Sequence, residues 1–320
     1  MKLLITGGLG FIGSNFIRFM LNEHRDITIS NLDAKTYAGN IKNLIDIESD
    51  GRYSFICGNI CDPDIVETVF SLHDIDTVVH FAAESHVDRS VHDSTPFITT
   101  NVLGTHTLLE AALRHNCRRF VHISTDEVYG STVTGSFRES DPLNPSSPYS
   151  ASKAASDLIA RAFFTTHNLP VIVTRCTNNF GPFQYPEKLI PLFVTNILQG
   201  KNVPIYGTGK NVRDWIYVLD HCSAIDFILG KGTAGEIYNI GSGNEKTNLE
   251  ITYTILEMLG ADNSRIEFVH DRPGHDWRYS LDSSKLRALG WKPRATFGSA
   301  LKDTIEWYAH NKGWWQPLLR

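Results

Sequence analysis

A glycine-rich turn near the N-terminus constrains this chain more than any other feature. It follows the apolar run 3–6 and precedes a segment with helical periodicity at 14–24. Its glycines are Gly7, Gly8, Gly10 and Gly13. This spacing allows a tight turn and a close approach of the backbone to a pyrophosphate, which then lies at the positive end of the helix. Asp33 follows the next apolar run, where a carboxylate accepts hydrogen bonds from ribose hydroxyls and repels a 2′-phosphate. The turn therefore predicts a site for NAD rather than NADP.

Short apolar runs alternate with longer amphipathic segments through the first half of the chain. The runs cover residues 3–6, 27–32, 53–57, 77–82, 120–124 and 171–175, and the segments with helical periodicity cover 14–24, 64–71, 97–116 and 148–167. Nearly continuous apolar runs are typical of strands buried on both faces of a parallel sheet. The alternation predicts an α/β fold, a Rossmann-like doubly wound parallel sheet, with an NAD-binding domain at residues 1–176.

Glycine, proline and asparagine become frequent after residue 176, which favours a lobe with long loops. We expect a smaller substrate-binding lobe at residues 177–320, with helices at 248–259 and 297–311. Within it, the segment 213–240 carries two apolar runs, 215–218 and 236–240, which we expect to return to the main sheet.

Composition excludes several classes of protein. The 320 residues carry a formal net charge of −5 with acidic and basic residues mixed, so no basic patch for nucleic acid is expected. Five cysteines without a CxxC or zinc-ligand spacing predict free thiols in a reducing compartment and no metal site. No apolar stretch approaches the length of a membrane span, and no signal sequence is evident, so we expect a cytoplasmic protein.

Tyr149 and Lys153 stand four residues apart at the start of the helix expected at 148–167. This spacing places both side chains on one helical face. A phenol has a pKa of about 10, and an adjacent ammonium together with a positively charged nicotinamide would lower it. The pair is therefore expected to remove a hydroxyl proton while the same carbon loses a hydride to NAD.

Five further segments carry a resemblance that covers nearly the whole chain. They are AAESHVDRS at 82–90, STDEVYG at 124–130, NNFGP at 178–182, PEKLIP at 186–191 and DRPGHD at 271–276. With the glycine turn and the Tyr–Lys pair, the chain resembles the extended short-chain dehydrogenase/reductase family. Within it, the chain is similar to the NAD-dependent nucleoside-diphosphate-glucose 4,6-dehydratases, especially those acting on dTDP-glucose. The resemblance implies a hydro-lyase that forms the 4-keto-6-deoxy sugar.

The adjacent carboxylates Asp126 and Glu127 suit this chemistry on general grounds. Oxidising C4 of glucose to a ketone makes the proton on C5 acidic, so that water can leave from C5 and C6. Two neighbouring carboxyl groups in a poorly solvated site have divergent pKa values, which provides one base and one acid. The resemblance implies that Glu127 is the base at C5, Asp126 the acid at C6, and Thr125 the residue that positions the C4 hydroxyl. Strand alternation, however, would turn one of the two carboxylates outward.

The resemblance also implies which residues line each binding site. For the cofactor they are Gly7, Gly10, Phe11, Ile12, Gly13, Asp33, Ala34, Lys35, Thr36, Asn59, Ile60, Phe81, Ala82, Ala83, Ser85, Thr100, Tyr149, Lys153 and Asn179. For the nucleotide sugar they are Ser85, Thr125, Asn178, Lys188, Leu189, Pro204, Ile205, Tyr206, Arg213, Asn248, Asp271, Arg272, Pro273, Gly274 and His275. Arg213 and Arg272 also fit phosphate contacts on their chemistry alone.

Three residues depart from the family pattern. Asn59 stands where an Asp is usual near the adenine, Phe180 replaces a Tyr beside the nicotinamide region, and Trp277 replaces an Arg near the nucleotide. The last change leaves the choice between dTDP-glucose and UDP-glucose open. A nucleotide-sugar 4-epimerase and a non-catalytic nucleotide-sensing scaffold are two further candidate functions. Segments 97–116 and 148–167 resemble the pair that forms a four-helix dimer interface in the family, which implies a homodimer.

Overall fold

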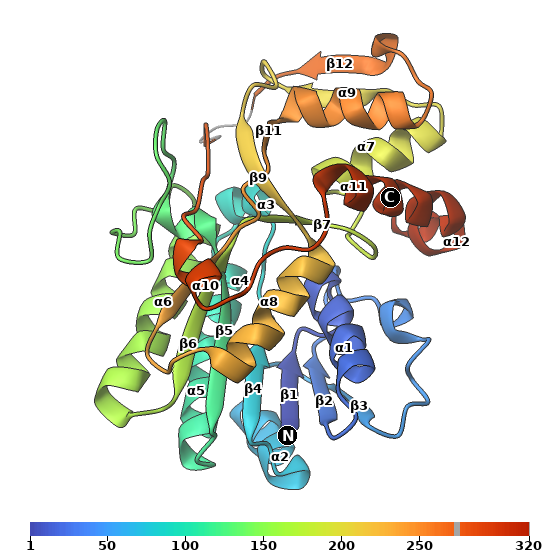
Figure 1. The fold of residues 1–320 in the computed structure, drawn as a ribbon. Helices are drawn as coiled ribbons and strands as arrows, with labels where there is room; N and C mark the ends of the chain where they lie inside the picture. The colour runs from blue at the N-terminus through green and yellow to red at the C-terminus, as the bar shows by residue number, and fades with distance from the viewer. Residues whose placement is uncertain (272–275, 320) are drawn as a thin grey trace.

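The computed structural model of the protein describes residues 1–271 and 276–319 (Figure 1). Its main sheet has seven parallel strands in the order β10-β6-β5-β4-β1-β2-β3. The strands are β1 (Lys2–Thr6), β2 (Thr28–Asp33), β3 (Tyr53–Cys57), β4 (Thr77–His80), β5 (Arg119–Thr125), β6 (Val171–Cys176) and β10 (Ile237–Ile240). The six runs expected in the first half all form strands of this sheet, which confirms the doubly wound fold.

Helices cover both faces of the sheet and enclose a core on each side. The helices of one face are α1 (Phe11–Glu23) and α8 (Val218–Lys231), and those of the other are α2 (Pro63–His73), α5 (Thr105–Arg114) and α6 (Pro148–His167). The helix expected at 97–116 is interrupted, because a π-helical stretch, η2 (Ile98–Gly104), precedes α5. Short helical turns complete this part at η1 (Ile41–Leu44), α3 (Val87–His92), α4 (Thr95–Phe97) and η3 (Asp126–Tyr129).

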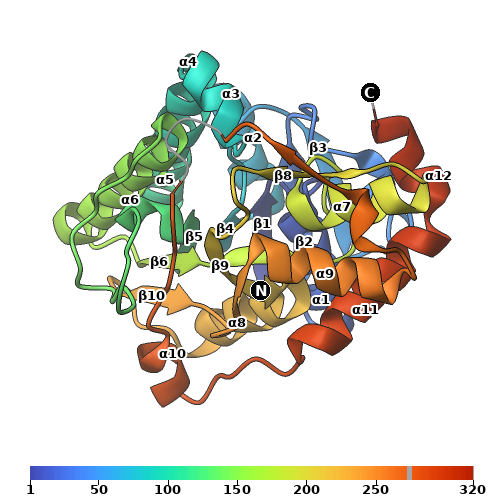
Figure 2. The same ribbon diagram turned by 90° about the horizontal axis from the view of Figure 1, so that it is seen from above.

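The second half of the chain adds two small sheets and a third core. The sheets are β11-β9-β7, formed by Glu245–Thr247, Val212–Tyr217 and Asn178–Phe180, and β12-β8, formed by Ile266–Val269 and Val203–Tyr206. The helices are α7 (Leu189–Leu198), α9 (Asn248–Met258), α10 (Ser284–Ala288), α11 (Phe297–His310) and α12 (Lys312–Trp315), with single turns η4 (Asn263–Arg265) and η5 (Gln316–Leu318). Figure 2 shows α7, α9, α11 and α12 together on the side away from α5 and α6.

One expectation about the sheet is wrong. The run 215–218 does not rejoin the main sheet, because β9 pairs with β7 on one edge and β11 on the other. The run 236–240 does return, as β10 beside β6. Among the described residues, no helix is both long enough and apolar enough to cross a lipid bilayer.

Trp314, on α12, is linked through Asn43 to the glycine turn at the other end of the sequence. Trp314 donates from its indole Nε1 to Oδ1 of Asn43 at 2.8 Å. Asn43 in turn donates from Nδ2 to the carbonyl oxygen of Leu9, inside the turn, also at 2.8 Å. Residues far apart in sequence therefore support the same loop.

Candidate active site

A cavity of about 360 Å³ lies at the carboxyl ends of the parallel strands. It is lined by residues that follow β1, β2, β4 and β5, by the start of α6, and by the segment 176–188. Ligands of open α/β sheets bind at this edge, so the position agrees with a dinucleotide site.

The cavity brings most of the expected cofactor residues together. The lining includes Gly7, Gly10, Phe11, Ile12, Gly13, Asp33, Ala34, Thr36, Asn59, Ile60, Phe81, Ala82, Ala83, Ser85, Thr100, Tyr149, Lys153 and Asn179. Lys35 is not among the lining residues; it adopts a positive φ of 51°, and its backbone N–H donates to Asp33 Oδ1 at 2.8 Å. Lys35 therefore shapes the loop, and its side chain need not face the cavity.

The glycine turn leaves a cradle that side chains would fill. Gly7 has a φ of 71°, and a Cβ there would lie 2.6 Å from the backbone nitrogen of Ala82. A Cβ on Gly13 would lie 2.5 Å from the carbonyl oxygen of Gly7. Gly10, the N-cap of α1, offers no side-chain cap, so the helix presents backbone N–H groups at its N-terminus. The residues present fit a bound pyrophosphate.

Asp33 closes the same turn from the end of β2. Its Oδ2 accepts a hydrogen bond from the Leu9 backbone N–H at 2.9 Å. Burial raises the pKa of the Asp33 carboxyl, against the effect of the backbone donors Lys35 and Leu9. The side chain predicted to contact ribose therefore also fixes the turn, and this second role is not visible in the sequence.

Tyr149 and Lys153 lie in the first turns of α6, whose start is set by a capping box of Ser147 and Ser150 and by Pro148 at its first position. Both side chains are buried and both line the cavity. The ammonium of Lys153 donates to the carbonyl oxygen of Ile123 at 2.7 Å. Burial lowers the pKa of Lys153 to about 8.

The pKa of Tyr149 moves in the direction opposite to the sequence expectation. Burial, followed by the negative charge of Glu127, raises it well above its usual value, and a hydrogen bond with Thr125 opposes this effect. The protein's own groups thus keep the phenol protonated. A lowering of this pKa needs a positive charge in the cavity, which an oxidised nicotinamide carries.

Asp126 and Glu127 both line the cavity, although strand alternation would separate them. The reason is that β5 ends at Thr125, and η3 carries the two carboxylates around a tight turn. The Thr125 hydroxyl caps this turn by accepting from the Glu127 backbone N–H at 3.3 Å, and it donates to Asp126 Oδ1 at 3.2 Å. Burial, then the charge of Glu127, raises the pKa of Asp126 well above its usual value. Burial and the neighbouring charge thus favour the protonated form of Asp126.

The residues expected to hold the nucleotide sugar are divided by the structure. Ser85, Thr125, Asn178 and Lys188 line the cavity, whereas Leu189, Pro204, Ile205, Tyr206, Arg213, Asn248 and Asp271 do not. Arg272, Pro273, Gly274 and His275 lie outside the described residues. Arg213 is buried and donates from Nη2 to the carbonyl oxygen of Asp276 at 2.9 Å, and its charge partly opposes the rise in the pKa of Asp126.

The structure shows the surroundings of two residues that depart from the family pattern. Phe180 is 1% exposed, does not line the cavity, and packs against Trp215, Tyr217 and Phe297 in the third core. Asn59 does line the cavity, and its Oδ1 accepts from the backbone N–H of Cys61 at 2.9 Å.

Sequence reasoning missed a cluster over the cavity. The phenol of Tyr37 donates to Oε1 of Glu187 at 3.1 Å, and the guanidinium of Arg89 lies 3.7 Å from the centre of the Tyr37 ring. Tyr37 and Glu187, 150 positions apart in the sequence, both line the cavity. Segments 82–90 and 186–191 match family motifs and so mark this region, but a motif does not show which of its residues meet in space.

Comparisons with known proteins identify the family of this chain. The family model described as GDP-mannose 4,6 dehydratase matches residues 4–304. A dTDP-glucose 4,6-dehydratase from Actinoplanes sp. is 53% identical over 98% of this chain and 100% of its own length.

Two solved structures have the same fold as this chain. DesIV of Streptomyces venezuelae, a dTDP-glucose 4,6-dehydratase with NAD and TYD bound, superposes with a TM-score of 0.96 at 52% identity, covering 99% of this chain and 100% of that one. The UDP-glucose 4-epimerase of Thermus thermophilus, complexed with NAD, reaches a TM-score of 0.90 at 29% identity, covering 97% and 100%. The chain belongs to the GDP-mannose 4,6 dehydratase family.

Proposed function

We propose that this protein is a dTDP-glucose 4,6-dehydratase that uses NAD and forms dTDP-4-keto-6-deoxyglucose and water. The observation that carries the proposal is the placement of Asp126 and Glu127 in the same cavity as Tyr149, Lys153 and the glycine turn. An epimerase needs the oxidising pair and the cofactor site, but it has no elimination step that would use an adjacent acid and base. Relatives and solved structures of high identity carry the same name.

The first step uses the start of α6. NAD, held by the glycine turn and Asp33, would supply the two-electron acceptor needed to oxidise C4 of the sugar and the hydride needed at C6. Tyr149 accepts the proton of the C4 hydroxyl, which Thr125 orients through its contact with the phenol. Lys153, one helical turn after Tyr149 on α6, donates its hydrogen bond to Ile123, and its ammonium would add to the positive charge of the nicotinamide in favouring the phenolate.

The elimination uses the two carboxyl groups of η3. Glu127 removes the C5 proton, which the adjacent C4 ketone has made acidic. Asp126, whose pKa burial raises, donates a proton to the departing C6 oxygen. Water leaves from C6, Glu127 returns its proton to C5 at the end of the cycle, and the proton that Tyr149 took from the C4 hydroxyl replaces the one that Asp126 gave up.

We also propose that the two parts of the chain bind different ligands. Residues 1–176, completed by α8 and β10, hold NAD, while residues 177–320 hold the nucleotide sugar. Asn178 and Lys188, which line the cavity, are assigned to the phosphates, and Asn179 to the cofactor. Pro204, Ile205, Tyr206 and Asn248 are assigned to the nucleoside and Arg213 and Arg272 to the nucleotide phosphates, while Asp271, Pro273, Gly274 and His275 are assigned to the nucleotide sugar without a more specific role. The free thiols suit the cytoplasm.

The same reasoning favours a homodimer. Val91, Ile98, Leu103 and Leu158, on α3, η2 and α6, are each more than half exposed. Apolar side chains exposed on adjacent helices are typical of an interface, and α6 contacts both α3 and η2.

The test is product analysis with dTDP-glucose and UDP-glucose in parallel. We expect mass spectrometry to find a product lighter by one water, with dTDP-glucose the better substrate. An isomeric product of unchanged mass would instead identify an epimerase, and the absence of any product from either compound would favour a non-catalytic protein.

A further inference from the structure

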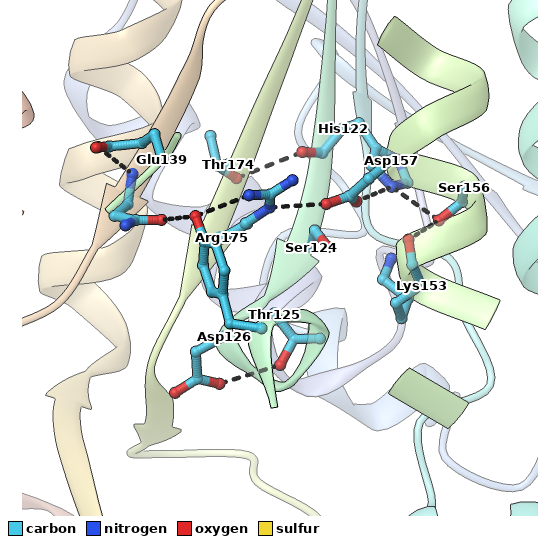
Figure 3. A network of polar contacts seen from close by, with 12 residues as sticks. His122, Ser124, Thr125, Asp126, Glu139, Lys153, Ser156, Asp157, Thr174 and Arg175 are labelled. Carbon is cyan, nitrogen blue, oxygen red and sulfur yellow. Dashed lines mark hydrogen bonds and ion pairs between the residues drawn. The ribbon is translucent and has the colours of Figure 1, made fainter. Parts of the chain in front are cut away.

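A buried polar network lies behind the carboxylate pair and connects it with the helix of Tyr149 and Lys153 (Figure 3). Arg175, on β6, is at its centre. Its Nε donates to Oδ2 of Asp157 at 2.9 Å, and its Nη1 donates to the hydroxyl oxygen of Tyr129 at 2.7 Å. None of these three residues lines the cavity.

The two partners of Arg175 belong to the two halves of the proposed reaction. Asp157 lies on α6, one helical turn after Lys153, so it shares an element with the residues that oxidise C4. Tyr129 is the last residue of η3, the single turn that begins with Asp126 and Glu127. One guanidinium thus joins the oxidising helix to the eliminating turn.

The network is too deeply buried to be an ordinary surface ion pair. Arg175 and Tyr129 are each 1% exposed, and Asp157 is fully buried. Burial of a charge pair costs desolvation energy that its attraction barely repays, so an apolar pair of similar volume would stabilise the fold at least as well. A role in fixing geometry explains the pair better than a role in stability.

Further contacts restrict Tyr129 from several sides. Its hydroxyl donates to Oδ1 of Asn239 on β10 at 2.9 Å while it accepts from Arg175. Its ring stacks on Phe137 with centroids 5.1 Å apart and planes at 8°. Because η3 has only four residues, fixing Tyr129 also limits where the side chains at its start can lie.

We propose that Tyr129 and Arg175 are positioning residues that hold η3 in register with α6. Through them the carboxyl groups of Asp126 and Glu127 meet C5 and C6 while the phenol of Tyr149 meets C4. The inference builds on the proposed function, because only a reaction with both steps needs both elements aligned on one sugar. A displacement of about 1 Å in such an arrangement costs roughly 100-fold in rate.

Tyr129→Phe tests the proposal, because it deletes only the hydroxyl and leaves the ring stacked on Phe137. Tyr238→Phe is the matched control. Tyr238 is also buried and lies on β10, but its hydroxyl accepts from the backbone N–H of Thr233 at 3.0 Å, outside the network. Both variants lose buried hydrogen bonding at a phenol, so a purely structural effect should be similar in the two.

Two measurements separate positioning from stability. With dTDP-glucose, we expect Tyr129→Phe to lower the rate of product formation about 10- to 100-fold while the absorbance of reduced nicotinamide accumulates, since C4 is still oxidised but elimination lags. Hydrogen exchange of peptides covering residues 124–130 should become faster in Tyr129→Phe and stay unchanged in Tyr238→Phe.

Three results would overturn the proposal: unchanged product formation, a slower rate without accumulated reduced nicotinamide, or unchanged exchange at residues 124–130. Arg175→Lys, which keeps the charge beside Asp157 but lacks the planar fork, should behave as Tyr129→Phe does and serves if that variant fails to fold. A wild-type protein that forms no product would reject the proposed function, whereas the exchange comparison would still decide whether the network holds η3.

Discussion

Replacing Gly13 with alanine tests whether the glycine turn is a close-packed cradle. Gly13 lies in the first turn of α1, and an added Cβ would approach the carbonyl oxygen of Gly7 to 2.5 Å and the Cα of Gly8 to 2.9 Å. Ordinary contacts begin at 3.4 Å, so the helix and the turn would have to separate by nearly 1 Å.

Two effects of opposite sign determine the change in stability. Alanine favours a helix interior over glycine by about 1 kcal/mol. Overpacking costs about 1–3 kcal/mol, and the upper value applies here because the opposing atoms are backbone. The Gly7 N–H donates to the Leu32 carbonyl at 3.0 Å, and the Leu9 N–H to Asp33, so the turn has little room to move. We expect a net loss of about 2 kcal/mol in the free energy of unfolding.

The measurement is urea unfolding, with Gly298→Ala as the matched control. Gly298 lies in the first turn of α11, and a Cβ there meets nothing within 4 Å, so that variant should gain up to about 1 kcal/mol. NAD affinity, measured by calorimetry, should fall at least tenfold in Gly13→Ala, which corresponds to about 1.4 kcal/mol. The reasoning is refuted if Gly13→Ala is as stable as the wild type and binds NAD equally well.

Three further predictions concern the acid–base pair, the buried lysine and the proposed dimer. Glu127→Gln should lower product formation at least about 100-fold while the absorbance of reduced nicotinamide accumulates, and a rate within tenfold of wild type would exclude Glu127 as the C5 base. Burial lowers the pKa of Lys153 from 10.5 to about 8, so the unfolded chain binds more protons between these values and stability should rise with pH there. From about pH 8 to pH 10, the free energy of unfolding from urea titrations should rise with pH by up to about 1.4 kcal/mol per pH unit more in the wild type than in Lys153→Met, which keeps the buried thiols that titrate in the same range. Leu158→Asp should give monomers in size-exclusion chromatography with light scattering. The control Leu72→Asp, which changes a still more exposed leucine on α2, should remain dimeric. If Leu158→Asp also remains dimeric, the interface lies elsewhere.

The strands of the main sheet were predictable because burial on both faces leaves a direct trace in the sequence. The sequence of a strand does not show which other strand it pairs with. The run 215–218 is as apolar as the strands of the main sheet, yet β9 pairs with β7 and β11, and only its neighbours in space decide this. The packing of the Phe180 ring in the third core was not predictable for a similar reason, since its position in the sequence does not show which side chains surround it.

The site was predictable where short-range geometry determines it. The glycine turn and the Tyr–Lys pair depend on spacing within one element, and both line the cavity. The joint inward placement of Asp126 and Glu127 could have been inferred from Thr125, a good N-cap residue directly before them. Arg175 and Asp157 could not, because charged residues in a sequence give no sign of being buried.

The hydrogen bonds from Trp314 to Asn43 and from Asn43 to Leu9 bear on how the protein is made. A ribosome releases residues in order, and these bonds join positions 314, 43 and 9. The glycine turn, which we propose holds the cofactor's phosphates, is therefore supported only after a further 271 residues beyond Asn43 have been synthesised. Contacts of such long sequence separation form late in folding. The nascent chain should consequently acquire NAD near the close of its maturation, rather than use the cofactor as an early template.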